Sequence, residues 1–337
     1  MERTRFGTTD LYVSDIGFGC ARLGGFFQSA DKPGMVRTLR EALAAGVTFY
    51  DTSDMYTQGE SEQVLGEAFR GVRDQVVLAS KFGYCLPAQR QLLSRVKPLV
   101  KPLVQRLGLR REHLPSAIRG SLAQNFSPSY VVHAVEQSLR RLKTDHLDLC
   151  QLHSPPAEVL AQGDFLAPLQ LLQRQGKIRY YGVSCEHTSD AQVCLRLAGI
   201  SSLQFRMSLL DQSALPAALE RAAARGVAVI ARECFAGGLL AKPAEALDLD
   251  ALLPDDAERG AKRQEISALR AVAERSSRSL PELALQFIRS VEGVSVTLVG
   301  MRTSAHLADT LRLRAAAPLS DGERQAVAAL RQTALPQ

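Results

Sequence analysis

Four side chains that can hold or move a proton follow short apolar runs of this sequence: Asp51, Tyr56, Lys81 and His153. A free tyrosine has a pKa of about 10, so a neighbouring cation is needed to favour its ionised form near neutrality. Lys81 can supply that cation and Asp51 can hold the ammonium by an ion pair. His153 can hydrogen-bond an oxygen atom of a bound molecule and assist proton transfer. Together the four predict delivery of a proton from Tyr56 to that oxygen.

Each of the four also fits a structural role when it is taken alone. Asp51 could cap a turn, Tyr56 could be a half-buried loop aromatic, and Lys81 could be a surface charge. His153 could be a hydrogen-bonded histidine beside the Pro-Pro turn that follows it. A joint role is favoured because all four stand at or just after the ends of predicted strands.

Apolar runs rich in β-forming residues alternate with amphipathic helical runs along the chain, which is typical of parallel strands joined by helical crossovers. The predicted strands are Ile16–Gly19, Thr48–Asp51, Val76–Lys81, Leu147–His153, Ile178–Ser184, Ser202–Met207, Val227–Cys234 and Val294–Gly300. The predicted helices are Val36–Ala45, Ser61–Phe69, Tyr130–Leu142, Phe165–Gln175, Asp190–Ala198, Pro216–Arg225, Lys262–Ser276 with Pro281–Ser290, and Ala305–Leu311. These strand–helix units predict one α/β domain over residues 1–337, a single (β/α)8 TIM barrel with its chemistry at the carboxyl ends of the strands.

Segments outside the regular units are also informative. Two short apolar runs around a Thr-Thr-Asp turn, within residues 5–13, predict an N-terminal β-hairpin under the barrel. The connections Cys85–Ser129 and Ala236–Ala261 are longer than a barrel needs, and both should rise over the catalytic face because both follow strands. The first has eight basic residues and one acidic residue, Glu112. This basic insertion (85–129) after strand 3 is either a solvated cover or a lid that attracts an acidic substrate or partner.

Composition excludes several classes of protein. The net charge of +6 is concentrated in that insertion, and we find no nucleic-acid reading module beside it. No apolar run is long enough to span a bilayer and no signal-type segment follows Met1, so we expect a soluble cytoplasmic protein without a membrane partner. Six cysteines without a C-x-x-C pair favour free thiols over disulfides or a metal site. Monomer and homo-oligomer both remain open.

Other common catalytic motifs are missing from the sequence. Gly17-Phe18-Gly19-Cys20-Ala21-Arg22 places arginine where the third glycine of a dinucleotide-binding fingerprint should stand. We also find no Walker-type loop, no H-E-x-x-H and no G-x-S-x-G. Phosphoryl transfer, zinc hydrolysis and serine hydrolase chemistry therefore lack their usual parts.

The local sequence around the four residues resembles the aldo-keto reductases. The matching stretches are Phe49–Tyr56 with Gly59-Glu60-Ser61-Glu62, then Ser80-Lys81-Phe82, and then Gln151-Leu152-His153-Ser154-Pro155. The resemblance implies an NADPH-dependent oxidoreductase that reduces an aldehyde or ketone to an alcohol by hydride transfer. Tyr56 would be the proton donor, and Asp51, Lys81 and His153 would complete the catalytic group. The substrate would be a small carbonyl compound, anionic if the basic insertion attracts it.

The same resemblance implies a set of residues for NADP. Ser184 and Gln204 match positions at the nicotinamide carboxamide, and Arg302 is the candidate for the 2′-phosphate of NADPH. The full set is Ser184, Cys185, Gln204, Arg232, Phe235, Gly237, Leu239, Gly300, Arg302, His306 and Asp309. Four positions depart from the family's usual residues. Cys185 stands in place of asparagine, Arg232 in place of a ring-stacking tyrosine, and Asp309-Thr310 in place of glutamate and asparagine.

Two other functions remain open at this point. One is a weakly catalytic or regulatory protein that binds the cofactor on the same fold, since Cys185 and Arg232 could slow turnover. The other is a barrel enzyme that uses Lys81 as a Schiff base.

Overall fold

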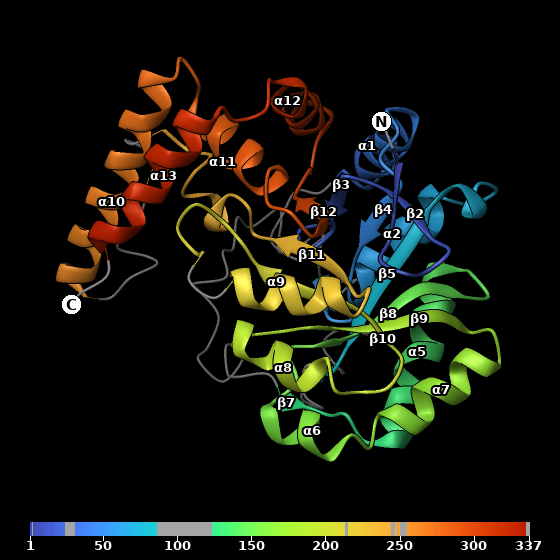
Figure 1. Ribbon diagram of the computed structural model, residues 1–337. Helices are drawn as coiled ribbons and strands as arrows, with labels where there is room; N and C mark the ends of the chain where they lie inside the picture. The colour runs from blue at the N-terminus through green and yellow to red at the C-terminus, as the bar shows by residue number, and fades with distance from the viewer. Residues whose placement is uncertain are drawn as a thin grey trace.

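The computed structural model describes residues 3–23, 31–85, 123–212, 215–243 and 255–334, with Met1, Leu247 and Leu249. Its centre is a closed barrel in the order β10-β11-β12-β3-β4-β5-β8-β9, with every neighbouring pair parallel (Figure 1). The strands are β3 (Ile16–Gly19), β4 (Phe49–Asp51), β5 (Val77–Phe82), β8 (Leu147–His153), β9 (Ile178–Ser184), β10 (Ile200–Arg206), β11 (Ala228–Arg232) and β12 (Val294–Val299). The predicted (β/α)8 barrel is therefore confirmed, with each strand within a few residues of its predicted bounds.

Helices surround the barrel (Figure 1). They are α1 (Lys32–Ala44), α2 (Glu60–Ala68), α5 (Pro128–Leu142), α6 (Ala157–Gln162), α7 (Leu166–Arg174), α8 (Ala191–Cys194), α9 (Leu215–Ala224), α10 (Asp256–Arg275), α11 (Leu280–Arg289), α12 (Ser304–Ala315) and α13 (Asp321–Ala334). The predicted helix Asp190–Ala198 is wrong in length, because only four of its residues form α8, after a 3-10 turn at Thr188–Asp190. Helices α6 and α13 were not predicted.

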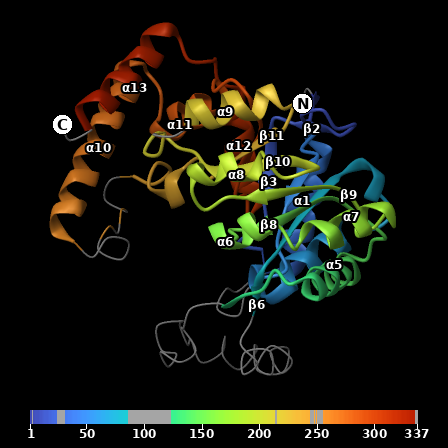
Figure 2. The same cartoon turned by 60° about the horizontal axis from the view of Figure 1, so that its bottom comes forward.

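The long connection predicted over Ala236–Ala261 is shorter than expected. Helix α10 begins at Asp256, where the Asp255 side chain accepts a hydrogen bond from the backbone N–H of Glu258 at 2.9 Å and caps the helix. Helices α10 and α13 lie side by side at one end of the molecule in both views (Figures 1 and 2). Leu269 and Val327 are buried together in a separate apolar cluster there.

The N-terminal hairpin is present, as predicted. Strands β1 (Arg3–Arg5) and β2 (Tyr12–Ser14) pair antiparallel. Phe6 and Leu11 between them are buried in one cluster with Phe49, Leu149 and other inward-facing residues of the barrel strands. The hairpin therefore closes the amino-terminal floor of the barrel and leaves chemistry to the opposite end.

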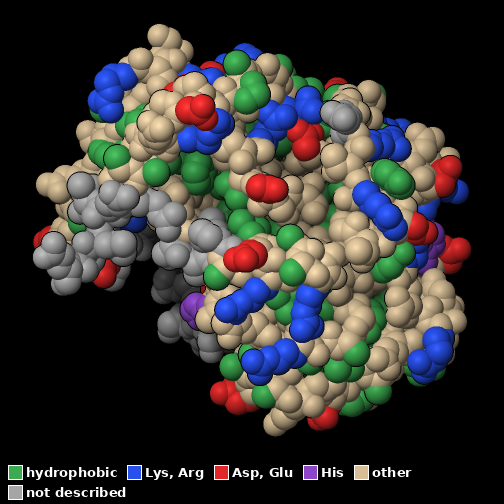
Figure 3. Space-filling view, in the orientation of Figure 1, with side chains coloured by type: hydrophobic (Ala, Val, Ile, Leu, Met, Phe, Trp, Pro, Cys, Tyr) green, Lys and Arg blue, Asp and Glu red, His purple; other side chains and the backbone are tan. Residues whose placement is uncertain are grey.

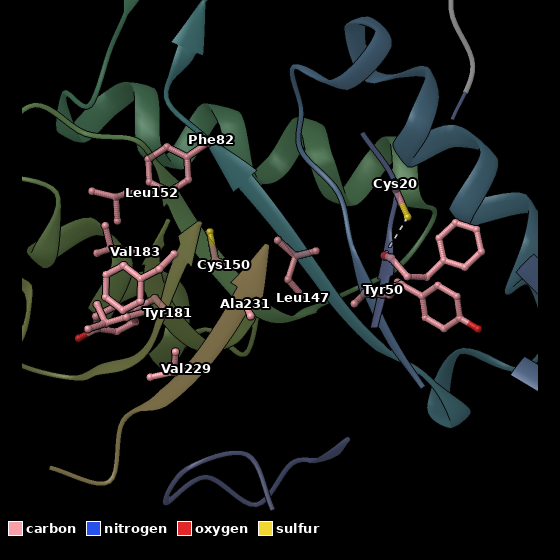
Figure 4. Close-up of a cluster of buried hydrophobic side chains, with 14 of the residues drawn as sticks. Cys20, Tyr50, Phe82, Leu147, Cys150, Leu152, Tyr181, Val183, Val229 and Ala231 are labelled. Atoms are coloured by element: carbon pink, nitrogen blue, oxygen red, sulfur yellow. Dashed lines mark hydrogen bonds between the residues drawn. The ribbon is translucent and has the colours of Figure 1, made fainter. Parts of the chain in front are cut away.

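A second apolar layer lies between the strands and their helices. This layer is formed by the strand residues that alternate with the inward-facing ones, among them Tyr50, Phe82, Leu152 and Val183 (Figure 4). Because successive strand side chains point to opposite faces, the residues that fill this layer determine which ones point into the barrel. None of the described helices is both long and apolar enough to cross a membrane.

The insertion after β5 is described only at its ends. Strands β6 (Tyr84–Cys85) and β7 (Ala123–Gln124) pair antiparallel and bring the two ends together. The eight basic residues lie outside the described residues, so the lid and its attraction for an anionic substrate remain predictions. On the face shown in Figure 3, basic and acidic side chains are interspersed.

Helix α2 is held to the barrel by a buried carboxylate. Glu62 is fully buried and accepts hydrogen bonds of 2.6 Å from Ser80 Oγ of β5 and from Arg141 Nε of α5. Ser80 precedes Lys81, so this contact ties the helix after Tyr56 to the strand that carries the lysine. Breaking a buried ion pair from one side leaves a charge without a partner.

We therefore expect Glu62→Ala to lower the free energy of unfolding by about 3 to 5 kcal/mol in urea denaturation. Glu67→Ala on the same helix is the control, because its pair with Lys32 is exposed and should contribute less than about 1 kcal/mol. Equal losses for the two variants would contradict the role given to Glu62.

Candidate active site

In four of the strands, β4, β5, β8 and β11, the inward-facing residues change from apolar to polar toward the carboxyl end. In β4 the sequence runs from Phe49 to Asp51, and in β5 from Val77 and Ala79 to Lys81. In β8 the same face carries Leu149, Gln151 and His153, and in β11 it carries Ile230 and Arg232. The barrel interior is therefore apolar toward the amino ends of the strands and polar at their carboxyl ends, where barrel enzymes place their chemistry.

The Lys81 ammonium is the centre of this polar layer. The side chain is 1% exposed, and Nζ donates hydrogen bonds to Asp51 Oδ2 at 2.5 Å, Thr52 O at 3.0 Å and Tyr56 Oη at 3.2 Å. Burial alone would lower the pKa of Lys81, but the negative charge of Asp51 and the contact with Tyr56 raise it above its ordinary value. Lys81 is therefore a cation whose three N–H bonds are all directed at oxygen atoms.

Tyr56 lies between the end of β4 and a tight turn that leads into α2. Thr57 and Gln58 adopt left-handed backbone angles, with φ of 50° and 63°, before Gly59 opens α2 at a φ of 83°. Burial raises the pKa of the Tyr56 phenol above its ordinary value, although Lys81 lowers it as expected. The predicted effect of Lys81 is present, but burial is larger, so the phenol holds its proton at neutral pH.

His153 stands beside Tyr56 as a neutral ring. Its ring contacts those of Tyr56 and Tyr84 edge-on, with centroid distances of 5.7 and 4.8 Å. Burial, with the positive charges of Lys81 and Arg232, lowers the pKa of His153 well below its ordinary value. The structure thus brings all four predicted catalytic residues together.

Several contacts that support the four were not predicted. Gln151 is fully buried and donates to Asp51 Oδ1 at 3.1 Å, while Gln204 donates to the same oxygen at 3.0 Å. Gln124 of β7 donates from Nε2 to the backbone oxygens of His153 and Ser154. The spacing Leu149-Gln151-His153 gives the only sequence signal for these contacts, because it places Gln151 on the inward face.

The residues expected at the nicotinamide differ in how well they fit. Ser184 Oγ donates to Gln204 Oε1 at 3.1 Å, so both predicted carboxamide contacts are linked to Asp51. The Cys185 thiol instead lies in the outer layer, 3.9 Å from Cys194 Sγ. Arg232 donates to the Cys185 carbonyl and to Glu233 Oε1, each at 2.9 Å, so part of its charge is neutralised.

The residues expected at the phosphates lie on open surface. A Cβ added to Gly237 or Gly300 would meet no atom within 4 Å, so a ligand can approach either backbone. Phe235 and Leu239 flank Gly237 and pack against the apolar clusters. Arg302, His306 and Asp309 are exposed around the start of α12, where Thr303 Oγ1 accepts the His306 N–H at 3.2 Å. Open glycines and a helix amino end beside an arginine fit a dinucleotide.

A sequence model described as the aldo/keto reductase family matches residues 15–332. The chain belongs to this family. Membership makes it an oxidoreductase that uses a nicotinamide cofactor, NADH or NADPH, on carbonyl compounds.

The individual relatives agree with this assignment. The chain is 27% identical over 335 residues to "Uncharacterized oxidoreductase YqkF" of Bacillus subtilis, covering 97% of this chain and 95% of that one. The holo form of aldo-keto reductase AKR11C1 from Bacillus halodurans matches with a TM-score of 0.76 and 28% identity, covering 98% and 96%. Glycerol dehydrogenase AKR11B4 from Gluconobacter oxydans also has a TM-score of 0.76, but at 21% identity it shows only the fold.

The contacts of Lys81 predict that two variants of this aldo-keto reductase differ in activity. Lys81→Met should reduce kcat by at least about a thousandfold, because it removes the cation nearest the phenol. Asp51→Asn should be slower than the native protein but active, because Thr52 O and Tyr56 Oη still accept from Lys81. The measurement is turnover of NADPH with a panel of aldehydes and ketones, and equal activity of the two variants would contradict it.

Proposed function

We propose that this protein is an NADPH-dependent reductase of an aldehyde or ketone, with Tyr56 as the proton donor. The observation that carries the proposal is the 3.2 Å hydrogen bond from the buried Lys81 ammonium to Tyr56 Oη. It places a cation beside the one oxygen that would gain negative charge when the proton leaves. The stabilisation would therefore increase as the reaction proceeds, which is what lowers a barrier.

The bound cofactor would supply the hydride to the carbonyl carbon. Tyr56 Oη would give its proton to the carbonyl oxygen, and the phenolate left behind would be held by Lys81. His153 would donate a second hydrogen bond to that oxygen from its ring nitrogen Nε2. Asp51, fixed by Gln151 and Gln204, would hold the ammonium in place. Ser184 and Gln204 would orient the nicotinamide carboxamide.

The two alternative functions have less support. A Schiff base requires a neutral amine, whereas the pKa of Lys81 is raised and its N–H bonds are directed at three oxygens. A regulatory protein would not need the catalytic four to remain in contact. Single-turnover oxidation of bound NADPH by a carbonyl compound separates a reductase from a cofactor sensor.

Tyr56→Phe should abolish carbonyl reduction while NADPH binding, followed by fluorescence or calorimetry, changes less than about threefold. The phenol contributes only when the carbonyl oxygen gains charge, so its loss affects kcat far more than cofactor affinity. Turnover retained by this variant would remove Tyr56 from the mechanism.

Arg302 is proposed to favour NADPH over NADH, since a guanidinium can bind a 2′-phosphate with two hydrogen bonds. Arg302→Ala should weaken NADPH binding on the order of tenfold with little change for NADH, and should reduce the salt dependence of NADPH binding. Arg324→Ala, an exposed arginine of α13 that is paired with Asp321, is the control. An unchanged ratio of the two dissociation constants would assign the phosphate to another residue.

A further inference from the structure

A chain of hydrogen-bonding groups runs from His153 away from the substrate side of the ring. Ser53 Oγ lies 3.1 Å from His153 Nδ1 and 3.2 Å from Asp54 Oδ1. The same oxygen accepts a hydrogen bond from the Met55 N–H at 3.2 Å and lies 3.3 Å from the Lys81 carbonyl. The hydroxyl has one proton and several acceptors around it, so its neighbours decide where that proton points.

The backbone holds this chain in place. Thr52 N donates to Ala79 O at 2.8 Å and Asp54 N donates to Lys81 O at 3.0 Å, which extends the ladder of β4 and β5 past the end of β4. Ser53 itself is fully buried. The contact with His153 is therefore part of the barrel rim and is not a contact of a mobile loop.

We propose that Asp54 is a positioning residue that selects, through Ser53, which ring nitrogen of His153 carries the proton. The catalytic consequence rests on the proposed carbonyl reduction, whereas the selection itself does not.

Two arrangements of protons follow from the geometry. With a proton on Asp54, its carboxyl donates to Ser53 Oγ, Ser53 donates to His153 Nδ1, and the ring proton is on Nε2, free to bind a carbonyl oxygen. When one proton leaves to solvent, Ser53 donates to the Asp54 carboxylate and His153 Nδ1–H donates to Ser53 Oγ. Nε2 is then unprotonated, and its lone pair repels the carbonyl oxygen. In this change Asp54 passes its proton to Ser53 Oγ, Ser53 passes its own proton to His153 Nδ1, and the Nε2 proton leaves to solvent, so the two arrangements differ by one proton.

The groups around Asp54 allow this change near neutral pH. Loss of hydration and the negative charge of Glu62 raise the pKa of Asp54 to about 7, although Arg141, Ser53 and the Met55 N–H act in the opposite direction. Of the other titratable groups near it, Tyr130 of α5 and Cys150 of β8 have pKa values raised above their ordinary ones. His153 has its pKa lowered, so the ring stays neutral on both sides of pH 7.

The direction of the pH dependence follows from the raised pKa of Asp54. Below about pH 7 Asp54 keeps its proton and Nε2 can donate, whereas above it the donor is lost. The catalytic efficiency of reduction should therefore decrease on the order of tenfold between about pH 6 and about pH 8.5, since one hydrogen bond to the developing charge disappears.

The test is the tautomer of His153, read from the ¹⁵N chemical shifts of ring-labelled histidine in the free protein. A His153→Gln spectrum assigns the signal. We expect the protonated nitrogen to change from Nε2 to Nδ1 with a midpoint near pH 7, and Asp54→Asn to keep Nε2–H throughout, because its amide N–H can donate to Ser53. Asp74→Asn removes a carboxylate at the opposite, exposed end of β5 and should behave as the native protein.

Ser53→Ala provides a second variant that breaks the chain without changing a charge. Its His153 tautomer should no longer depend on pH, and the pH dependence of its catalytic efficiency should flatten as in Asp54→Asn. A native tautomer that is the same at both pH values, or a change that survives in both variants, would overturn the proposal. A normal tautomer change in a protein that reduces no carbonyl compound would instead overturn the proposed function.

Discussion

The buried ammonium of Lys81 is the interaction on which the rest of the site depends. A cation at 1% exposure is stable only if nearby groups replace the water it has lost, and here one carboxylate and two oxygens do so. Each of those oxygens has its own constraint. Asp51 is fixed by two glutamines, Thr52 O belongs to the rim of β4, and Tyr56 directly precedes a left-handed turn. The proposed catalytic group is thus one connected network and not four independent side chains.

The exclusion of water from the barrel interior determines the protonation states of this network. The hairpin and the inward-facing apolar residues close the floor, so the charges at the mouth interact at short range with little screening. The same dryness explains the pKa directions: it keeps Tyr56 protonated and His153 neutral, while Asp51 keeps Lys81 charged. A neutral acid beside a fixed cation is suited to give up its proton only when a reacting oxygen demands it.

Much of this arrangement follows from the sequence. Apolar runs rich in β-forming residues located the strands, and Asp51, Lys81 and His153 were predicted at their carboxyl ends; the structure confirms both. Hydrogen-bond partners did not follow, because Ser53 and Gln124 meet His153 only when segments distant in sequence come together. The direction in which the pKa of Tyr56 is shifted was also not predictable from the sequence. It depends on whether burial, which raises the pKa, has a larger effect than Lys81, which lowers it. Helix α13 was not predicted because it follows helix α12 and not a strand, so it lies outside the repeated strand–helix units.

The departures from the family's usual cofactor residues are reconciled in part by the structure. Cys185 contributes its backbone carbonyl to Arg232 and its thiol to the outer layer, so Ser184 and Gln204 remain as the pair proposed for the carboxamide. Arg232 is partly neutralised by Glu233 and, at 3.8 Å, by Glu186. Its remaining charge lowers the pKa of His153 and thereby helps keep that ring neutral.

The central claim is that Lys81 acts on the reaction through Tyr56. A double-mutant cycle tests it most directly, with Tyr56→Phe, Lys81→Met and the double variant compared by single-turnover oxidation of bound NADPH with one aldehyde. The account predicts that the double variant is no slower than the slower single variant, because without the phenol the ammonium has no proton transfer to assist. Losses that multiply in the double variant would show that the two residues act independently and would contradict the account.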